Sequence, residues 1–533
     1  MKLNYAKTIE KWGIFEVTVS GPKEGNPFCD QWIKGTFCCK NEKKTVDGFY
    51  DRDGVYKVRF MPSFTDEYTF EIEASFDINM GEEVPEHKLG IADGGKEAEK
   101  YVVRNMLTGS FTVTSPSADN HGPVRVAGTY YLAYEDGTPY HCIGTTCYVW
   151  NLQNEELQKQ TLKTLEENAF NKIRFCIFPK HYDYNLHEPI TYPYEGTPCD
   201  NSELNENNFA EYNGCAPGND WDFTRFNPAH FQHIEKCIQA LMKLGIEADL
   251  IVMHPYDRWG FSMMQAEDDD RYWKYVLARF SAYRNVWWSL ANEYDLMHEK
   301  TLSDWERYAG IICEKDPYHH LRSIHNCKAY YDYNLPWITH CSIQRTETYR
   351  SSELVNEWRE KYHKPVVLDE ICYEGNIQFG WGNISGEEMT RRFWEAFCRG
   401  GYPGHGETYL SPDRILWWSH GGVLHGTSPE RIKFLAKIMG ETPGLGVEPM
   451  PCKWDEVACR AAGFPARKDY FIYYYSFMRP GFRDFYFDDT TEYQVEIIDT
   501  WEMTITDGGI HKGKFRVQLP GKEYMAVRLR VAK

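Results

Sequence analysis

Hydrophobic and polar residues alternate in two different ways along the 533-residue chain. Up to about residue 115, short runs of β-branched and aromatic residues alternate with polar ones, and Gly, Pro, Asp and Asn separate the runs. This pattern is typical of the half-buried strands of a β-sandwich. The same alternation returns after about residue 444, in segments such as FIYYYSFM and MAVRLRV. The pattern therefore predicts an all-β domain at each end of the chain.

The central part of the chain contains apolar runs of four to seven residues that alternate with segments of helical period. Parallel strands that are buried on both faces produce such runs, and alternation with helices indicates βα units. Eight runs can be counted, so we expect a (β/α)₈ TIM barrel flanked by an N-terminal β-sandwich and a small C-terminal β domain. The expected domains cover residues 1–120, 121–443 and 444–533. The expected barrel strands cover residues 141–146, 172–178, 246–253, 286–290, 322–325, 337–341, 365–368 and 404–409.

Composition and charge narrow the class of ligand. The net charge is −19 and no run of Lys or Arg offers a phosphate-binding stripe, so nucleic acid is not an expected partner. With 17 Trp and 37 Tyr, the chain has flat amphipathic rings to spare for the C–H faces of sugars, although most such rings belong to cores. A carbohydrate substrate is therefore expected, and a homo-oligomer remains open.

The N-terminal segment has no apolar leader-like stretch, and no run reaches the roughly 18 apolar residues of a membrane span. The 16 Cys are dispersed through apolar runs. We therefore expect a cytoplasmic protein with reduced thiols and no membrane partner. No CxxC or HExxH motif occurs, so no metal and no cofactor are expected.

Two glutamates that follow predicted barrel strands are the candidates for catalysis. Side chains that face the substrate of a barrel enzyme project from the carboxyl ends of its strands. Glu293 follows the run VWWSL after the fourth strand, and Glu370 follows VVL after the seventh. These strands lie across the barrel from each other, so the two carboxyl groups can share a site. Cleavage of a glycosidic bond with retention needs such a pair, an acid/base and a nucleophile, about 5–5.5 Å apart.

Either glutamate alone would be unremarkable, because Asn-Glu and Asp-Glu pairs are common on solvated loops. Their joint position at strand ends favours the catalytic interpretation. The neighbouring Asp369 leaves the nucleophile open, since either member of Asp369-Glu370 can point inward and strand alternation allows only one.

The segments WSLANEYD (288–295) and KPVVLDE (364–370) resemble the strand-four and strand-seven signatures of glycoside hydrolase clan A. Over about residues 130–440 the chain is most similar, within that clan, to the bacterial apiosidase-like group, and the flanking β regions resemble those that accompany such barrels. The resemblance implies that Glu293 is the acid/base and Glu370 the nucleophile. It also implies that Asn292 hydrogen-bonds the sugar 2-hydroxyl and that Arg174 keeps the nucleophile ionised.

Further polar and aromatic residues near the predicted strand ends are candidates for contacts with sugar. They are His254, Asp257, Arg258, His340, Gln344, Trp221, Trp417 and Trp418. Each has a structural alternative, because a buried histidine can serve the wall of the barrel and one of the paired tryptophans can belong to the core.

The connection over residues 179–227 is far longer than the usual βα loop of about two to six residues, and it is rich in tyrosine. We expect it to cover one side of the pocket and to make the enzyme exo-acting on imported oligosaccharides or plant glycosides. The resemblance points to apiosides or other pentofuranosides.

Three alternatives accompany this interpretation. A non-catalytic carbohydrate-binding protein is disfavoured by the two strand-end glutamates. An inverting or metal-assisted hydrolase would need a wider carboxyl separation or a cluster of ligands. A transglycosidase would use the same catalytic residues, so the sequence leaves it open.

Overall fold

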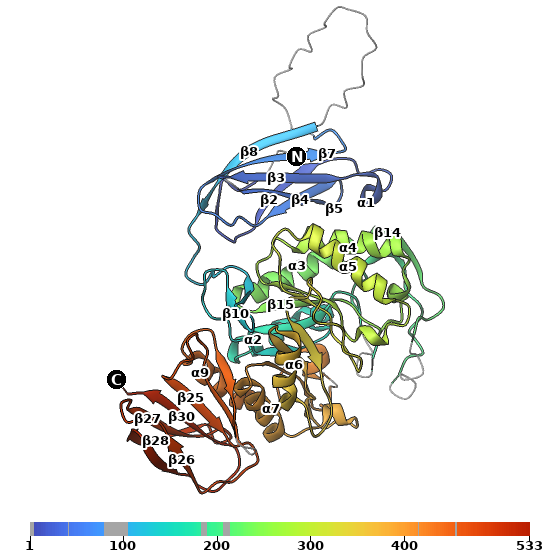
Figure 1. The fold of residues 1–533 in the computed structure, drawn as a ribbon. Coiled ribbons are helices and arrows are strands. Elements are labelled where there is room, and N and C mark those ends of the chain that lie inside the picture. The colour runs from blue at the N-terminus through green and yellow to red at the C-terminus, as the bar shows by residue number, and fades with distance from the viewer. Residues whose placement is uncertain are drawn as a thin grey trace, which may run out of the picture.

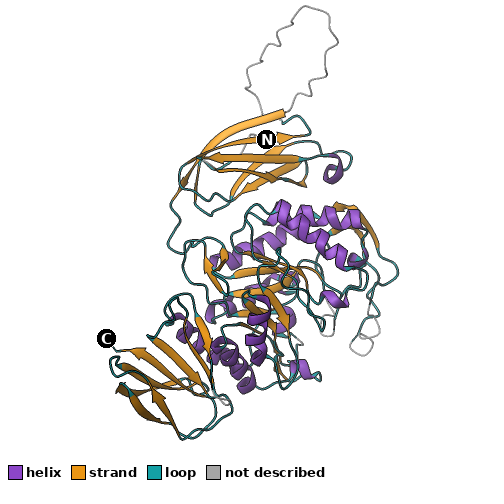
Figure 2. Ribbon diagram, viewed as in Figure 1, coloured by secondary structure: helices purple, strands orange, loops and turns teal. Residues whose placement is uncertain are grey.

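The protein has a central barrel with a β domain on either side, as a computed structural model shows (Figure 1). Helices are concentrated in the central part, and strands dominate both outer parts (Figure 2). The structure describes residues 5–40, 42–78, 105–182, 189–205, 214–413, 415–452 and 456–532.

The N-terminal domain packs a five-stranded sheet, in the order β1-β8-β7-β3-β4, against a three-stranded sheet, β2-β6-β5. Buried positions alternate with partly exposed ones along β2 and β3, as one-sided burial of a strand requires. Phe15 stacks on Phe111 across the sandwich, with 3.7 Å between ring centres. The elements are β1 (Thr8–Glu10), β2 (Phe15–Ser20), α1 (Pro27–Asp30), β3 (Ile33–Cys39), β4 (Glu42–Asp47), β5 (Phe49–Arg52), β6 (Val55–Phe60), β7 (Glu67–Ala74) and β8 (Asn105–Thr114).

Eight parallel strands form the barrel, in the order β17-β16-β15-β12-β11-β21-β19-β18. A parallel bridge between His325 and Ser342 joins the two edge strands and closes the ring. The predicted TIM-barrel fold with β-rich flanks is thereby confirmed. The strands are β11 (Gly144–Thr146), β12 (Lys172–Cys176), β15 (Glu247–Met253), β16 (Val286–Ala291), β17 (Arg322–Ser323), β18 (Cys341–Gln344), β19 (Val366–Glu370) and β21 (Tyr402–His405).

Both faces of the barrel strands are buried, and all seven residues of β15 are buried although two of them are acidic. Helices cover the outside of the ring, and α3 presents Phe231, Ile234 and Ile238 to it. None of the described helices has the length and apolar character that crossing a membrane requires. The helices are α2 (Glu155–Glu167), α3 (Pro228–Lys243), α4 (Ala266–Phe280), α5 (Leu302–Lys315), α6 (Val355–Tyr362), α7 (Gly386–Cys398), α8 (Trp417–His420) and α9 (Ser428–Gly440).

Two predicted strands lie at other positions in the structure. The sixth strand begins at Cys341, where the prediction ended, and the stretch 324–340 before it contains no helix. The eighth is Tyr402–His405 and not 404–409. Its Pro403 and Gly404 are poor strand formers, so pattern alone misplaces it. Gly404 is needed there, because a Cβ would lie 2.8 Å from the carbonyl oxygen of Leu368 on the neighbouring strand.

Short β elements extend the barrel. A hairpin of β9 (Val124–Ala127) and β10 (Tyr131–Tyr134) precedes the first barrel strand. The long connection after β12 contains a second hairpin, β13 (Tyr194–Thr197) with β14 (Asp220–Phe226). Residues 183–188 and 206–213 of this connection lie outside the described residues.

The C-terminal domain has a six-stranded sheet, β23-β24-β25-β30-β27-β28, and a two-stranded sheet, β26-β29. Tyr474 of this domain stacks on Trp394 of α7, with 5.6 Å between ring centres. The boundaries at residues 120 and 443 stay predictions. The strands are β23 (Val447–Met450), β24 (Val457–Ala461), β25 (Tyr470–Tyr474), β26 (Phe482–Tyr486), β27 (Tyr493–Asp499), β28 (Thr504–His511), β29 (Lys514–Gln518) and β30 (Met525–Val531).

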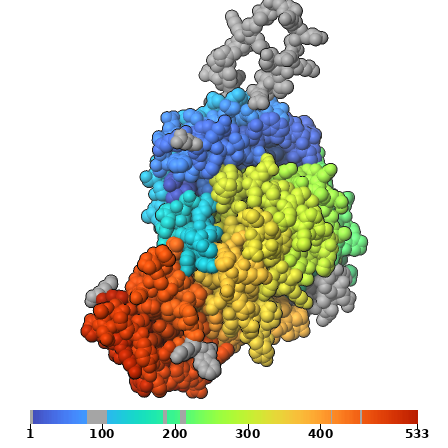
Figure 3. Space-filling view, in the orientation of Figure 1, coloured from blue at the N-terminus to red at the C-terminus, as the bar shows by residue number. Residues whose placement is uncertain are grey.

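Buried charges join the N-terminal domain to the barrel. Arg59 of β6 lies 2.6 Å from the carboxylate of Glu235 on α3, and Arg279 of α4 lies 3.0 Å from Asp51. The two domains lie directly against each other in the space-filling view (Figure 3).

Candidate active site

A cavity of about 260 Å³ opens at the carboxyl end of the barrel strands. Residues from all eight strand ends or the loops after them line it, which is where barrel enzymes place their active sites. The lining residues are Tyr148, Lys180, Tyr182, Tyr256, Glu293, Cys327, Lys328, Gln344, Thr346, Glu370, Tyr373, Trp381 and Trp418. Both strand-end glutamates predicted from the sequence therefore lie in one pocket.

Glu370 is surrounded by hydrogen-bond donors and a cation. The Tyr148 hydroxyl donates to its carboxylate, and Arg174 Nη1 donates to the same oxygen over 3.3 Å. Nε2 of His325 lies 3.7 Å away. Burial, together with the charge of Arg174, lowers the pKa of His325 well below its usual value, so that imidazole is neutral. Charge-assisted hydrogen bonds of this kind hold a carboxylate in a fixed orientation.

Glu293 lies in a less polar setting. It follows β16 with φ 53° and ψ 54°, a left-handed conformation that few non-glycine residues adopt, and this conformation breaks the strand direction at Glu293. Burial and then the charge of Glu370 raise its pKa, although the Tyr256 hydroxyl hydrogen bond and the charge of Lys180 oppose the shift. A carboxyl group with a raised pKa can keep a proton at a pH at which its neighbour has lost one.

Asn292 connects the two carboxyl groups. Its Oδ1 accepts hydrogen bonds from Arg174 Nη2 over 3.0 Å and from the Tyr148 hydroxyl over 3.2 Å. Its Nδ2 donates to Glu293 over 3.3 Å. Asn292 therefore contacts Glu293 directly and two partners of Glu370.

Below the pocket, charged side chains fill the inside of the barrel. Lys172 Nζ lies 2.7 Å from both Asp249 and Asp369. Burial opposes ionisation of Asp369, but the charges of Lys172 and Arg174 outweigh it and lower its pKa. Ser342 donates a further hydrogen bond to Asp369.

The expectation that strand alternation turns only one of Asp369 and Glu370 inward is wrong. Both reach partners on β12, which lies across the interior from β19 and is not its neighbour. The register between β18 and β19 shifts between Ile343 and Gln344, so the regular alternation does not continue to the strand end. Asp369 lies within the barrel, and Glu370 lies in the pocket above it.

Lys180 is a buried cation in the pocket without a carboxylate partner among the described residues. Its Nζ lies 3.4 Å from the ring centre of Tyr148, 4.4 Å from that of Tyr256 and 4.7 Å from that of Trp418. Such ring faces attract a cation. Burial lowers the pKa of this ammonium to about 8.

Of the residues predicted to contact sugar, Gln344 and Trp418 line the pocket. His254, Asp257 and Arg258 do not. His254 Nε2 lies 3.3 Å from the Phe178 carbonyl oxygen, and Arg258 donates to Asn201 over 2.7 Å. The Asp257 carboxylate accepts the backbone N–H groups of a turn, those of Trp259, Gly260 and Ser262.

Trp221, His340 and Trp417 also lie outside the pocket lining. Trp221 Nε1 donates to the Trp259 carbonyl over 2.9 Å, and Trp417 Nε1 donates to the Thr145 hydroxyl over 2.8 Å. His340 precedes β18 and packs edge-on against Trp287, at the opposite end of the strands. Trp221 therefore attaches the hairpin to the loop after β15, and Trp417 and His340 pack against barrel strands.

Several pocket residues were not predicted, namely Tyr148, Lys180, Tyr182, Tyr256, Tyr373 and Trp381. Each follows a barrel strand, so the strand-end rule could have suggested them. Nothing in the pattern distinguishes Tyr256, which lines the pocket, from His254 and Asp257 beside it. In the long connection 179–227, Lys180 and Tyr182 at its start reach the pocket, whereas Trp221 of the hairpin donates a hydrogen bond to the Trp259 carbonyl.

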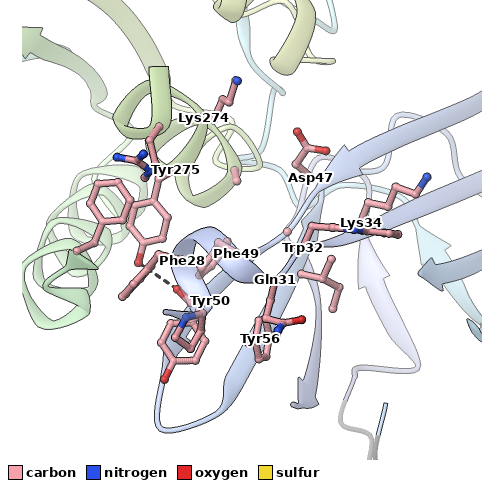
Figure 4. A pocket seen from close by; sticks show the side chains of 16 residues that line it. Phe28, Gln31, Trp32, Lys34, Asp47, Phe49, Tyr50, Tyr56, Lys274 and Tyr275 are labelled. Carbon is pink, nitrogen blue, oxygen red and sulfur yellow. Dashed lines mark hydrogen bonds between the residues drawn. The ribbon is translucent and has the colours of Figure 1, made fainter. Parts of the chain in front are cut away.

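A larger cavity of about 420 Å³ lies between the N-terminal domain and α4 (Figure 4). Trp32 and Tyr50 from the domain face Lys274 and Tyr275 of α4 across it. Asp47 is the single carboxylate in its lining, so this groove has no carboxyl pair for glycoside cleavage. Of these two cavities, only the smaller contains such a carboxyl pair.

Comparisons with known proteins identify the family of the central domain. A family model described as the apiosidase-like catalytic domain matches residues 127–426. Two domain families of unknown function match at the ends, DUF5060 over residues 8–75 and DUF5605 over residues 454–530. No curated protein matches the chain.

Among solved structures, one from Bacteroides vulgatus that is assigned to the glycoside hydrolases is 36% identical, with a TM-score of 0.86. The match covers 99% of this chain and 100% of that one. A family 5 glycoside hydrolase from the same organism is 15% identical, with a TM-score of 0.57, over 77% of this chain and 94% of the other. The second likeness shows the barrel fold alone.

Proposed function

Because the chain belongs to the apiosidase-like family of glycoside hydrolases, we propose that it is a retaining, exo-acting glycosidase. The observation that carries the proposal is the pair Glu293 and Glu370, which share one pocket in different surroundings. One carboxyl group has a raised pKa, and the other accepts hydrogen bonds from an arginine and a tyrosine. Retaining hydrolysis requires such a division between an acid and a nucleophile.

In the first step, Glu370 forms a bond to the anomeric carbon while Glu293 donates its proton to the leaving glycosidic oxygen. The result is a glycosyl ester of Glu370 and a free aglycone. In the second step, Glu293 accepts a proton from water, whose oxygen attacks the same carbon and releases the Glu370 carboxylate. Arg174 and Tyr148 hold that carboxylate in position through both steps.

Asn292 is assigned the contact with the sugar 2-hydroxyl. Its amide contacts Glu293 and two partners of Glu370, and this position next to both carboxyl groups supports the assignment. Hydrogen bonds to this hydroxyl strengthen in the transition state of glycosidases.

The size and walls of the pocket support exo action on a terminal sugar. At about 260 Å³, the cavity is at the small end of ligand pockets, which usually measure about 300–1,000 Å³. Trp381 and Trp418 form an aromatic wall, with 5.2 Å between ring centres. A single sugar ring fits such a space. The expected substrates are oligosaccharides or plant glycosides, including apiosides or other pentofuranosides.

A panel of nitrophenyl glycosides, extended by plant flavonoid glycosides, identifies a cleaved substrate. Proton NMR of the reaction then gives the configuration of the first sugar released. We expect the configuration of the substrate, and an inverted product would refute the double displacement. On a defined oligosaccharide, release from one end only is expected, and early mid-chain products would contradict exo action.

A further inference from the structure

Three buried side chains that the proposed reaction does not use converge behind the pocket. They are Glu374 on β20 (Glu374–Gly375), His405 at the end of β21 and Glu407 on β22 (Glu407–Thr408). One potential ligand atom of each lies within 4.8 Å of those of the other two. None of the three residues is more than 1% exposed.

The imidazole of His405 is incompletely paired. Its Nδ1 lies 3.1 Å from the Thr145 hydroxyl. Its Nε2 is buried and has no hydrogen-bond partner among the described residues. Buried polar atoms without a partner are rare in proteins, and a bound ion is one explanation for them. Because Nδ1 is engaged with Thr145, Nε2 is the atom left to bind a ligand.

The two carboxylates are held in place by backbone N–H groups. Glu374 accepts from Thr427 over 2.7 Å and from Ser428 over 2.9 Å. Glu407 accepts from His425 over 2.6 Å and from Gly426 over 2.8 Å. Outer contacts of this kind orient the ligands in metal sites, where a ligating histidine also binds a partner through its other ring nitrogen.

The carboxylates also approach the same point without a cation between them. A Cβ on Gly426 would lie 2.5 Å from Glu374 Oε2 and 2.6 Å from Glu407 Oε2. In the described part of the chain, no Lys or Arg forms an ion pair with either group. Two buried carboxylates in such proximity require a compensating positive charge, which can be a proton or a metal ion.

We propose that Glu374, His405 and Glu407 form a structural site for a divalent metal ion of the zinc type. Zn²⁺ accepts imidazole nitrogen together with carboxylate oxygen, whereas Ca²⁺ and Mg²⁺ prefer oxygen alone. The sequence analysis expected no metal, because these ligands match no compact motif.

The site would connect three segments directly behind the catalytic pocket. Its ligands lie on β20, β21 and β22, and the loop before α9 donates backbone N–H groups to both carboxylates. Tyr373, which lines the pocket, precedes the ligand Glu374, and its ring packs so closely on Gly406 that a Cβ there would lie 2.0 Å away. The ion would touch neither Glu293 nor Glu370, so its role is to fix this wall and not to activate substrate.

The test uses the full-length protein, stripped with EDTA and then titrated with ZnCl₂ by calorimetry. We expect one Zn²⁺ per chain and a higher melting temperature with zinc than without it. Glu407→Gln keeps the shape of the side chain but removes a charged ligand. It should weaken zinc binding by at least about 100-fold, the upper range for loss of an outer contact.

Glu247→Gln is the matched control. Glu247 is another buried carboxyl group of the barrel, hydrogen-bonded to Trp287 Nε1 over 2.9 Å, and its replacement should leave zinc binding unchanged. Co²⁺ loaded into the wild type gives a second readout that does not depend on a folded variant. Nitrogen and oxygen ligands should give weak visible bands only, whereas binding to cysteine would give an intense near-ultraviolet thiolate band.

Three results would overturn the proposal. The wild type would bind no stoichiometric zinc, the cobalt protein would show thiolate ligation, or Glu407→Gln would bind zinc as tightly as Glu247→Gln. The first result would mean that a shared proton compensates the two carboxylates. Because the ion takes no part in bond cleavage, each outcome is independent of whether the proposed glycosidase activity is found.

Discussion

The inside of the barrel has two levels that differ in how completely their charges are paired. At the barrel floor, defined by Lys172, Asp249 and Asp369, the ammonium lies 2.7 Å from two carboxylates. At the barrel mouth, defined by Lys180, Glu293 and Glu370, the ammonium faces aromatic rings and forms no ion pair with a described carboxylate. The pKa of Asp369 at the floor is lowered, and that of Glu293 at the mouth is raised.

The difference separates stability from reactivity within one structure. The charged groups of the floor are paired with each other, so removal of one partner would leave a buried charge uncompensated. Incomplete pairing at the mouth leaves groups whose charge and proton are available to a substrate. Arg174 contacts both levels, because it lies 3.7 Å from Asp369 and 3.3 Å from Glu370. Asp369 at the floor thereby holds in place the Arg174 guanidinium that binds Glu370 at the mouth.

The largest expected effect is the loss of activity in Glu370→Ala. This change removes the group that forms the glycosyl-enzyme, so kcat/KM should fall by more than about 10⁴-fold. Substrates with good and with poor leaving groups should lose similar factors. The free energy of unfolding, measured by urea denaturation, should change little. An active Glu370→Ala beside an inactive Asp369→Ala would move the nucleophile from the mouth to the floor.

Glu293→Ala should have a smaller and substrate-dependent effect. Loss of general acid catalysis costs about 10²–10⁴-fold for a poor leaving group, but little for the glycosylation step of an activated aryl glycoside. Turnover should then stall at the glycosyl-enzyme, and azide should restore it with a product of retained configuration. If azide rescued Glu370→Ala with retention instead, the two assignments would be exchanged.

The same substitution at the two levels should change stability in opposite ways. Lys172→Met leaves the floor carboxylates without their ammonium and should lower the free energy of unfolding by about 3–5 kcal/mol. Lys180→Met removes an ammonium that burial already disfavours, so stability should stay equal or increase. Urea denaturation of both variants measures the contrast. Equal losses would show that the mouth is paired as fully as the floor.

The smallest expected effect is a displaced pH profile. The general acid works only while protonated, so activity should fall as pH rises through the raised pKa of Glu293. The positive charge of Lys180 lowers that pKa. Lys180→Met should therefore move the alkaline limb of kcat/KM to higher pH, and Lys180→Arg, which keeps a charge, should not. If the alkaline limb of kcat/KM stayed at the same pH in Lys180→Met, the charge of Lys180 would have no effect on the pKa of Glu293.

Strand length limits what could be predicted about the barrel. The strands β15 and β16 stand out in the sequence because burial on both faces favours apolar runs, such as LIVM in β15 and VWW in β16. By contrast, β17 pairs over only two residues, and β21 contains Pro403 and Gly404. Those two segments become strands because they pair with neighbouring strands, and intrinsic β propensity does not include this tertiary effect.

The candidate site, like the barrel, was predicted from the sequence only in part. The sequence by itself determined that Glu293 and Glu370 follow strands on opposite sides of a barrel, because strand order and apolar runs are local properties. Tertiary structure decided that Tyr148, Lys180 and Tyr256 complete the pocket. It also turned both Asp369 and Glu370 inward through the register shift at Ile343.

Clusters assembled from several loops depend wholly on the fold. Glu374 lies 31 positions from His405 along the chain, and only the pairing of β20 with β22 brings Glu374 beside Glu407. The sequence determined the chemical type of each side chain and the strand that it follows. Tertiary structure alone decided which of them meet, because the direction of a side chain at a strand end depends on bulges, on turns and on the strands packed beside it.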